Sequence, residues 1–376
     1  MFTDSNMKNV FTKAAFLLCA TGLTMSAFAG NKDRTGQAGA TELLINPWGQ
    51  STGLFGLNGS YVKGIEAMKV NIAGLSYAQN TEVGLAHTVY LRGSNVTVNN
   101  IGLAQNVGDF GVIGLNIMSM GFGDITITEA NNPEGNQGTY KPQFLTFQLG
   151  FAKEFSNSIR AGIGATFVSE QISNIHATGA CFEAGVQYIT GKRDNFHFGV
   201  TLRNVGTNMR FSGNGFAFNA EQPDNANGEE FFAQVPTEKF ELPTYLNFGV
   251  SYDFYLDENR MKNSEDMPKH RATIMGNFTS NSFLSDYIGG GVEYAFRETF
   301  MIRGGYRHES ADDVTSGSFF TGVSAGATIQ QGLGEKGPIL ALDYSYRPTQ
   351  RPNNGVHTVS LRLMTRARSK KAADTQ

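Results

Sequence analysis

The sequence lacks any apolar run of the roughly 20 residues that a membrane-spanning helix needs. Only 40% of the 376 residues are hydrophobic, there is one tryptophan, and no amphipathic helical pattern stands out. If this chain crosses a membrane, it must do so as a closed β-barrel, because only helices and edgeless sheets satisfy their backbone hydrogen bonds in lipid.

Motifs of common enzymes are also lacking. The sequence has no HExxH pattern, no phosphate-binding loop and no closely spaced cysteine pair. The six histidines are scattered, and His87 and His357 fall on apolar strand faces, where packing is favoured over catalysis. A Ser-His-Asp group assembles in space, so the sequence leaves that arrangement open. We otherwise expect no enzyme activity, no cofactor and no metal.

The first 29 residues read as a secretory signal peptide. Lys8 and Lys13 precede an apolar run from Ala14 to Leu23, and Ala27-Phe28-Ala29 is a small-residue cleavage site. Cleavage there would leave 28 basic and 32 acidic residues, a net charge of −4. A charge this small predicts no nucleic-acid partner. Cys181 would be the single remaining cysteine, so no internal disulfide is expected.

What the sequence has in abundance is glycine (45 residues) and phenylalanine (29), set in alternating segments. In Phe144–Phe155, Leu145, Phe147, Leu149 and Phe151 alternate with polar or small residues. Side chains of a strand point to opposite faces in turn, so each such segment has one apolar face and one polar or open face. The pattern predicts an all-β protein with a large apolar surface to cover.

We count fourteen candidate strands, of a length that suits an apolar band about 25 Å tall. They are Thr81–Leu91, Asn95–Gln105, Phe110–Met120, Phe144–Phe155, Ser158–Glu170, Thr178–Ile189, Phe196–Val205, Thr244–Tyr255, His270–Thr279, Phe283–Phe296, Thr299–Arg307, Phe319–Ile329, Ile339–Tyr346 and Val356–Thr365.

The connections alternate in character. Tight turns such as Ser156-Asn157 and Arg297-Glu298 alternate with long polar loops such as Gly121–Gln143 and Gly206–Pro243. Short turns on one side and long loops on the other are typical of an outer-membrane barrel with periplasmic turns. The sequence therefore predicts a fourteen-stranded transmembrane antiparallel barrel over residues 78–366, with both chain ends periplasmic and a basic tail at 367–376.

Residues 30–77 do not read as strands. They contain many glycines, Pro47-Trp48 and too many apolar residues for a disordered tail, and a short helix is expected through Ile65–Val70. The segment either lies against the sheet as a lead-in or folds into the barrel as a plug. We favour the plug because its glycines let the backbone run where side chains do not fit. The residues we single out in it are Glu42, Leu44, Trp48, Phe55, Asn71 and Gly74.

Two further groups of residues are candidates for function. A polar set faces the predicted lumen, either as charges neutralised in pairs or as a polar path or plug-docking surface: Arg160, Glu183, His197, Arg203, Glu293, Arg303, Asp343 and Arg362. The loop Gly206–Pro243 carries aromatics that suit either a partner surface or a loop that packs on itself: Phe211, Phe216, Phe218, Phe231 and Phe232.

Several segments in order along the chain resemble the PorV/PorQ family, the FadL-like barrels of the type IX secretion system of Bacteroidetes. They are Thr35–Ile45, Ser51–Gly59, Asn71–Leu75, Glu82–His87, Phe198–Gly206, Leu242–Tyr252, Gly291–Tyr306 and Ala341–Tyr346. Two positions depart from the family pattern. Ile72 stands where the family usually has proline, and the last strand runs past Leu363 instead of ending on an aromatic residue.

The resemblance implies a barrel with an N-terminal hatch and no catalysis, located in the outer membrane. It also implies partners, namely translocon or attachment-complex proteins and secreted cargo with C-terminal signal domains. The alternative is a FadL-like channel for a small hydrophobic compound with the hatch as its gate. The lumen separates the two, because a channel needs an apolar pocket that leads to an opening. The predicted lumen face is mostly Gly, Thr, Ser and paired charge, which favours the secretion role.

Overall fold

The computed structural model describes residues 34, 36–135, 137–221, 230–257, 269–309, 319–334, 337–350 and 354–366. The predicted signal peptide and the predicted tail 367–376 lie outside them. No helix in these residues is both long and apolar enough to cross a membrane.

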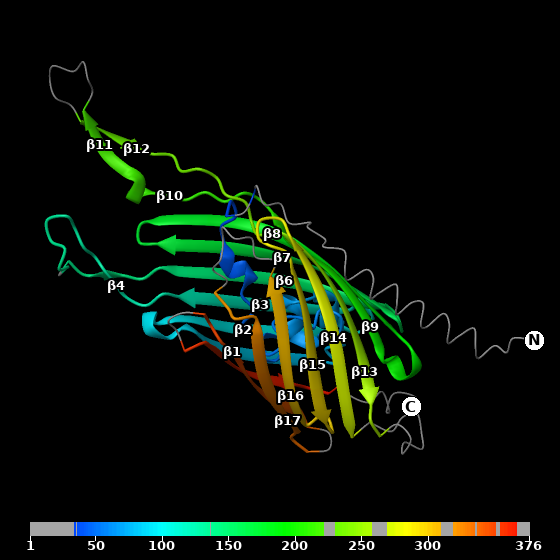
Figure 1. Cartoon of the computed structure of the whole chain (residues 1–376). Coiled ribbons are helices and arrows are strands. Elements are labelled where there is room, and N and C mark those ends of the chain that lie inside the picture. The colour runs from blue at the N-terminus through cyan, green and yellow to red at the C-terminus, as the bar shows by residue number, and fades with distance from the viewer. Residues whose placement is uncertain are drawn as a thin grey trace, which may run out of the picture.

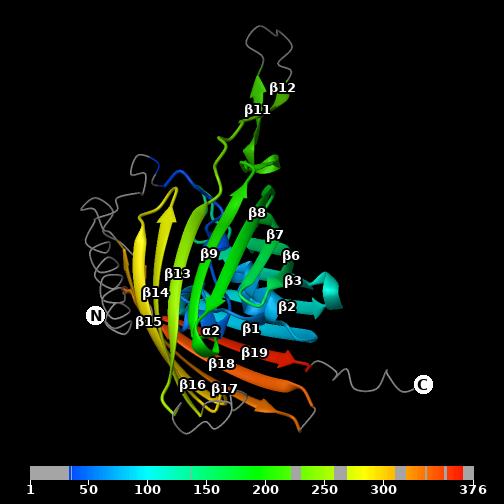
Figure 2. The ribbon, with the colours of Figure 1, turned by 90° about the vertical axis from the view of Figure 1, so that its right-hand side faces the viewer.

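Within the described residues, fourteen antiparallel strands form one closed sheet (Figures 1 and 2). The ring closes where the first strand pairs with the last, with Glu82 opposite Met364 and Val89 opposite His357. This confirms the predicted fold and strand number. In chain order the barrel strands are β1 (Thr81–Leu91), β2 (Val96–Asn106), β3 (Val112–Gly121), β6 (Gln143–Ser156), β7 (Ile159–Ile172), β8 (Ile175–Thr190), β9 (Phe196–Gly206), β13 (Tyr245–Tyr255), β14 (His270–Asn281), β15 (Tyr287–Phe296), β16 (Phe300–Glu309), β17 (Val323–Gly332), β18 (Ile339–Arg347) and β19 (Val356–Met364).

The outer surface of the barrel is apolar. Leu85, Ile163 and Val292 point outward and remain 51%, 63% and 52% exposed. Their neighbours along each strand point inward and are buried, as the alternation predicts. An apolar outer face around a closed sheet is what lipid requires, and the protein accordingly lies in an outer membrane.

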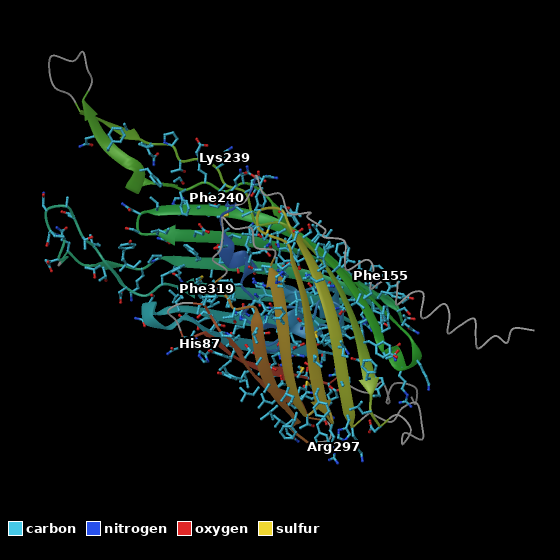
Figure 3. All side chains as sticks on the ribbon, in the orientation of Figure 1. His87, Phe155, Lys239, Phe240, Arg297 and Phe319 are labelled. Atoms are coloured by element: carbon cyan, nitrogen blue, oxygen red, sulfur yellow. The ribbon has the colours of Figure 1, made fainter. Side chains whose placement is uncertain are left out.

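The two ends of the barrel differ. One end, the long-loop end, carries the connections 122–142 and 207–244, and the other, the short-turn end, carries turns such as 157–158 and 297–299. Figure 3 shows Phe319 and Phe240 toward the first end, and Phe155 and Arg297 at the second. Outer-membrane barrels keep short turns on the periplasmic side, so the long-loop end faces the outside of the cell.

Several connections differ from the sequence prediction. The expected loop between Glu170 and Thr178 is a two-residue turn at Ser173-Asn174, because β7 and β8 continue into it. The expected loop Gly206–Pro243 contains β10 (Ser212–Gly213), which pairs with β8, and a ribbon of β11 (Ala217–Glu221) and β12 (Glu230–Gln234). The ribbon projects well beyond the barrel wall (Figures 1 and 2). The connection 122–142 holds a smaller pair, β4 (Ile125–Thr126) and β5 (Thr139–Tyr140).

The N-terminal segment threads the barrel lengthwise. The Arg34 guanidinium lies 2.5 Å from the Glu241 carboxylate, and Gly39 donates a hydrogen bond to the Glu241 carbonyl, so residues 34–39 sit at the long-loop end. The chain then descends inside the wall and emerges at the short-turn end before Thr81. The barrel thus begins at β1 and ends at β19 on the short-turn side, whereas the first described residues lie at the long-loop end.

Candidate functional site: the plugged lumen and its vestibule

Residues 40–78, the plug, fill the lumen. They form short helices, η2 (Thr41–Leu44), α2 (Gly49–Thr52), η3 (Gly64–Lys69) and η4 (Ile72–Tyr77). The third corresponds to the helix predicted at Ile65–Val70. The plug supplies most of the large side chains that are completely buried, namely Trp48, Leu54, Leu57, Ile65, Met68, Ile72 and Leu75. These residues form an apolar core in a place where a bare barrel of this size would be hollow.

Glycines in the wall make room for this core. A Cβ atom added to Gly102 would lie 2.5 Å from a side-chain carbon of Ile65, and one added to Gly84 would lie 2.5 Å from Trp48. At Gly114 the same atom would meet Met68 at 2.5 Å. Replacing any of these three glycines by a residue with a side chain would therefore displace the plug. The plug and the wall are matched in shape.

A buried ion pair of the wall binds backbone carbonyls in the middle of the plug. The Arg203 guanidinium lies 2.8 Å from the Glu183 carboxylate, and both side chains are 4% exposed. The same guanidinium donates to the backbone carbonyls of Met68, at 3.3 Å, and Lys69. The Gln148 amide donates to the Met68 carbonyl at 2.6 Å and to Glu183. Polar wall residues thus satisfy plug carbonyls that a short 3₁₀ turn leaves unpaired.

A second cluster binds the plug at the seam between the last strands. The Arg362 guanidinium contacts Asp343 at 3.0 Å and Glu66 of the plug at 3.4 Å. It also donates to the Gln50 amide oxygen at 2.9 Å, while Ser51 donates to Glu66 at 2.7 Å. Removing one partner from such a buried network is costly because it leaves an uncompensated charge.

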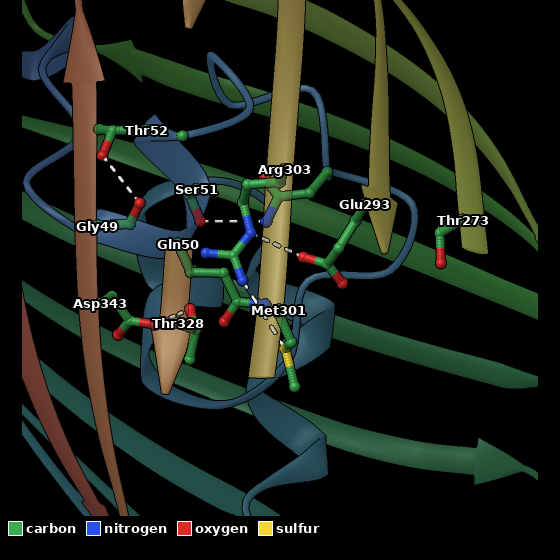
Figure 4. Close-up of polar contacts among 12 residues, drawn as sticks. Gly49, Gln50, Ser51, Thr52, Thr273, Glu293, Met301, Arg303, Thr328 and Asp343 are labelled. Carbon is green, nitrogen blue, oxygen red and sulfur yellow. Dashed lines mark hydrogen bonds and ion pairs between the residues drawn. The ribbon is translucent and has the colours of Figure 1, made fainter. Parts of the chain in front are cut away.

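A third ion pair lies beside α2. Arg303 contacts Glu293 at 2.8 Å, and Figure 4 shows the pair next to Gly49–Thr52. Arg271 approaches the same Glu293 at 3.0 Å, and His197 meets Asp253 at 3.2 Å farther round the wall. Arg160 is another predicted lumen residue, near the short-turn end. Its guanidinium pairs with Glu154 at 2.6 Å and stacks on the Tyr77 ring. Of the eight predicted lumen residues, six pair with one another, and Arg160 and His197 pair with Glu154 and Asp253.

The predicted plug residues fall at different depths. Trp48 is fully buried between Gly84 and Gly102. The Asn71 amide donates to the carbonyls of Gly59 and Val186, tying the plug to the wall. Gly74 packs so closely on Val62 that an added Cβ would lie 2.0 Å from its carbonyl oxygen. Glu42 and Leu44 lie at the top of the plug and line an open space, whereas Phe55 is buried.

That space is a cavity of about 850 Å³ at the long-loop end, which we call the vestibule. Its floor includes Glu42, Leu44 and Ile45 of the plug. Its walls carry aromatic side chains and two arginines, among them Tyr90, Phe122, Phe144, Tyr287, Tyr306, Arg307, Phe319, Phe320 and Arg347. The volume lies within the range of pockets that hold small organic molecules.

Aromatic and arginine side chains join the buried Phe55 of the plug to the wall of the vestibule. The Phe55 ring lies 4.3 Å from the Arg307 guanidinium and 5.7 Å from that of Arg347. Phe320 contacts Phe55 edge-on at 5.3 Å and lies 4.6 Å from Arg347. Phe55 itself adopts a positive φ of 57°, which a phenylalanine rarely does without support from its surroundings.

Sequence reasoning left Arg347, Tyr90 and Phe320 out of the candidate site. Strand alternation places the first two on the lumen face, but nothing local shows that Arg347 meets Phe55 or that Tyr90 meets Phe320. The predicted aromatic loop is also not one surface. Phe211 packs on Phe240 with ring centroids 5.7 Å apart, whereas Phe218 is 50% exposed. The side chains of Phe231 and Phe232 lie outside the described part of the structure.

The fold resembles solved outer-membrane barrels. The crystal structure of the toluene transporter TodX from Pseudomonas putida aligns over 86% of this chain and 100% of its own, with 12% identity and a TM-score of 0.54. A second crystal structure of that transporter aligns over 85% and 97%, with 13% identity and a TM-score of 0.52. A FadL homologue from Pseudomonas aeruginosa aligns over 84% and 97%, with 12% identity and a TM-score of 0.48. No protein-family model matches the chain, and no curated protein does. At this identity the likeness concerns the fold, a FadL-like barrel.

Proposed function

We propose that this protein is a non-enzymatic outer-membrane channel that admits a hydrophobic or amphipathic small molecule through the vestibule, with the plug as its gate. The observation that carries the proposal is the vestibule itself, a cavity of about 850 Å³ lined by aromatic rings and floored by the top of the plug. A purely structural barrel has no need of such a pocket. TodX, a toluene transporter of the same fold, supports the proposal by analogy of architecture.

Passage through the channel requires the plug to move, since it fills the lumen below the vestibule. A crosslink between plug and wall tests this. The hydroxyl oxygens of Thr52 on the plug and Ser345 on β18 are 2.6 Å apart, so cysteines at both positions should form a disulfide with little displacement. Thr88 and Thr358 have hydroxyls 2.9 Å apart within the wall, and cysteines there provide a matched control.

The expected result is that oxidised T52C/S345C takes up a hydrophobic dye more slowly than the same variant after reduction. The dye can be N-phenylnaphthylamine, offered to intact cells whose lipopolysaccharide slows unaided entry. The oxidised T88C/T358C control should take up dye at the wild-type rate. Equal uptake by both oxidised variants would show that the plug is not a gate.

A second candidate function is a role in type IX secretion, as the resemblance to the PorV/PorQ family implies. The specific observation in its favour is the ribbon β11–β12, which the barrel does not need and which projects from the long-loop end (Figure 2). In this role the barrel would bind translocon or attachment-complex proteins, or secreted cargo with C-terminal signal domains.

The ribbon can be removed cleanly. Val235 donates a backbone hydrogen bond to Phe216 at 2.9 Å, so residues 217–234 can be replaced by a tight turn. The β4–β5 pair offers a control, because Ile127 donates to Gly138 at 3.0 Å and residues 128–137 can be shortened in the same way. We expect the first deletion, and not the second, to abolish co-purification of secretion partners from the native outer membrane. Full recovery of partners without the ribbon would count against this role.

A further inference from the structure

The barrel wall has a notch at its short-turn end, between β3 and β6. The pairing of these two strands ends where Val112 lies opposite Ala152, yet β6 continues through residues 153–156. Among the described residues, no backbone hydrogen bond joins 153–156 to the turn 107–111. The side of β6 that faces β3 is therefore an unpaired strand edge here, whose N–H and C=O groups are left for another partner.

A cavity of about 410 Å³ occupies this notch. Its lining comes from both faces of the wall, because Ala152 faces the lumen and Lys153, the next residue along the strand, faces the lipid. Ser76 of the plug helix η4 also lines it. Phe155, another lining residue, lies at the short-turn end in Figure 3. The cavity thus leads from the periplasmic rim of the wall, at the level of the inner-leaflet headgroups, to the last helix of the plug.

Two charged side chains of the lining lack a protein partner. Lys153 belongs to β6 and Asp109 to the turn between β2 and β3, so they come from the two hairpins that flank the notch. Among the described residues neither forms an ion pair, whereas Glu154, the other charged residue of the lining, is paired with Arg160 at 2.6 Å. A free cation and a free carboxylate complement a ligand that carries both an anionic and a cationic group.

Aromatic side chains flank the notch on the lipid side. Phe110 is 61% exposed and packs on Phe151 with ring centroids 5.0 Å apart, and Phe155 is 68% exposed. Aromatic rings near the end of an outer-membrane barrel lie at the boundary between hydrocarbon and headgroups. They contact acyl chains there, while Lys153 keeps its stem along apolar surface and its ammonium group among the headgroups. The ligand that suits both parts of the notch is a lipid with a zwitterionic headgroup.

We propose that the notch binds the headgroup of an inner-leaflet phospholipid, with Lys153 and the free edge of β6 on its phosphate and Asp109 on its ammonium group. The edge of a sheet can bind an anion through its backbone N–H groups. The primary ammonium of phosphatidylethanolamine donates hydrogen bonds to a carboxylate, which the quaternary ammonium of phosphatidylcholine cannot do. The inference goes beyond the proposed channel and does not depend on it.

Native mass spectrometry of the purified full-length barrel tests the inference. The delipidated protein is offered phosphatidylethanolamine, phosphatidylcholine or phosphatidylglycerol with identical acyl chains, and the retained lipid is measured. We expect the affinity for phosphatidylethanolamine to be about 10-fold higher than for the other two, since a hydrogen bond between charged groups commonly contributes this much. Asp109→Asn should remove this preference, and Lys153→Gln should weaken the binding of all three lipids.

Arg297→Gln is the matched control, because Arg297 is an exposed cation at the same end that does not line the cavity. It should leave all three affinities unchanged, and heat-modifiable migration on gels should verify that every variant is folded. Equal retention of the three lipids by the wild type, or an unchanged preference in the Asp109 variant, would overturn the inference. Equal losses in the Lys153 and Arg297 variants would show a general attraction to surface charge and would overturn it as well.

Discussion

At the scale of single residues, the lumen-facing glycines decide whether the plug fits. Gly102 is the clearest case, since an added Cβ would lie 2.5 Å from Ile65 and 3.0 Å from Trp48. Both partners are fully buried large side chains and have no space into which to withdraw. A change at this one position acts on the plug without touching the lipid face.

We predict that Gly102→Val leaves the barrel assembled and raises its ion conductance in planar bilayers, because the valine side chain displaces the plug. Overpacking of this kind typically costs about 1–3 kcal/mol. Gly276→Val is the matched control, since nothing lies within 4 Å of an added Cβ there and the site faces outward. If both variants conducted like the wild type, the plug would be able to absorb the extra volume.

Glu42 supplies a second residue-scale prediction, concerning pH. Burial, followed by the repulsion of the Glu170 carboxylate, raises the pKa of Glu42 from its ordinary value of 4.5 to about 8, so the folded state holds the proton more tightly than the unfolded state. The stabilisation is complete below pH 4.5 and is lost as pH rises through 8. Glu170 opposes ionisation of Glu42, and Lys69 partly favours it. Hydrogen exchange of Thr41–Leu44 should therefore quicken between pH 7 and 9.

Glu42→Gln should remove that change, because the neutral amide cannot ionise. The exchange of Ile72–Tyr77, which lies far from Glu42 along the plug, serves as the internal reference and should show only the intrinsic pH dependence of amide exchange. An unchanged pH response in the Gln variant would mean that another group controls the top of the plug.

At the scale of elements, the plug is a segment with little regular structure that is held by the wall. Its helices are short, and its carbonyls at Gly59, Met68 and Lys69 accept hydrogen bonds from the wall residues Gln187, Gln148 and Arg203. It therefore depends on the barrel more than the barrel depends on it. The strands are complete without it, since each pairs with two neighbours.

We predict that deleting residues 42–75 spares barrel assembly and raises conductance to small ions well above that of Gly102→Val, because the lumen is then unfilled. Conductance in planar bilayers and heat-modifiable migration on gels are the two measurements. A deletion variant that assembled but conducted no better than the wild type would indicate that the loops close the lumen by themselves.

The sequence predicted the elements of the barrel better than those of the plug. Alternation along segments such as Phe144–Phe155 determines which face meets lipid, and the structure follows it in register. The Ser173-Asn174 turn was missed because the residues around it are not strictly alternating and read as loop. The course of the plug could not be predicted either, since 3₁₀ turns leave no periodic pattern. The vestibule could not be predicted because Phe55, Arg307 and Arg347 are far apart in the chain. Their side chains come into contact only in the closed barrel.

At the scale of the whole molecule, the stability of the inserted barrel depends on how deep in the bilayer each lipid-facing side chain lies. Phe147 lies within β6, opposite Ile117 and Phe167 on the neighbouring strands. Phe155 lies on the same strand near the short-turn end and is 68% exposed. A charge at the first position must sit in hydrocarbon, whereas at the second it reaches the interface.

We predict that Phe147→Arg destabilises the inserted barrel by about 2–4 kcal/mol, and Phe155→Arg by about 0–1 kcal/mol. Equilibrium unfolding by guanidinium in lipid vesicles measures both. A lumen-facing position such as Gly164 would be a poor control, because an added Cβ there would lie 2.7 Å from Ile72 of the plug. Equal losses at Phe147 and Phe155 would mean that the apolar belt is placed differently along the strands.

The path of the plug has a consequence for the order of events in assembly. The plug touches both strands of the seam where the ring closes, because Gly49 donates to the Ser360 hydroxyl of β19 and Gly64 lies against the Glu82 carboxylate of β1. A segment inside a closed ring cannot be inserted from the side, and the close fit at Gly84, Gly102 and Gly114 hinders its entry from an end. We therefore expect the sheet to close around its own leading segment, with the pairing of β1 and β19 formed last. The N-terminal segment is then enclosed when the ring closes, although the strands do not need it as a template.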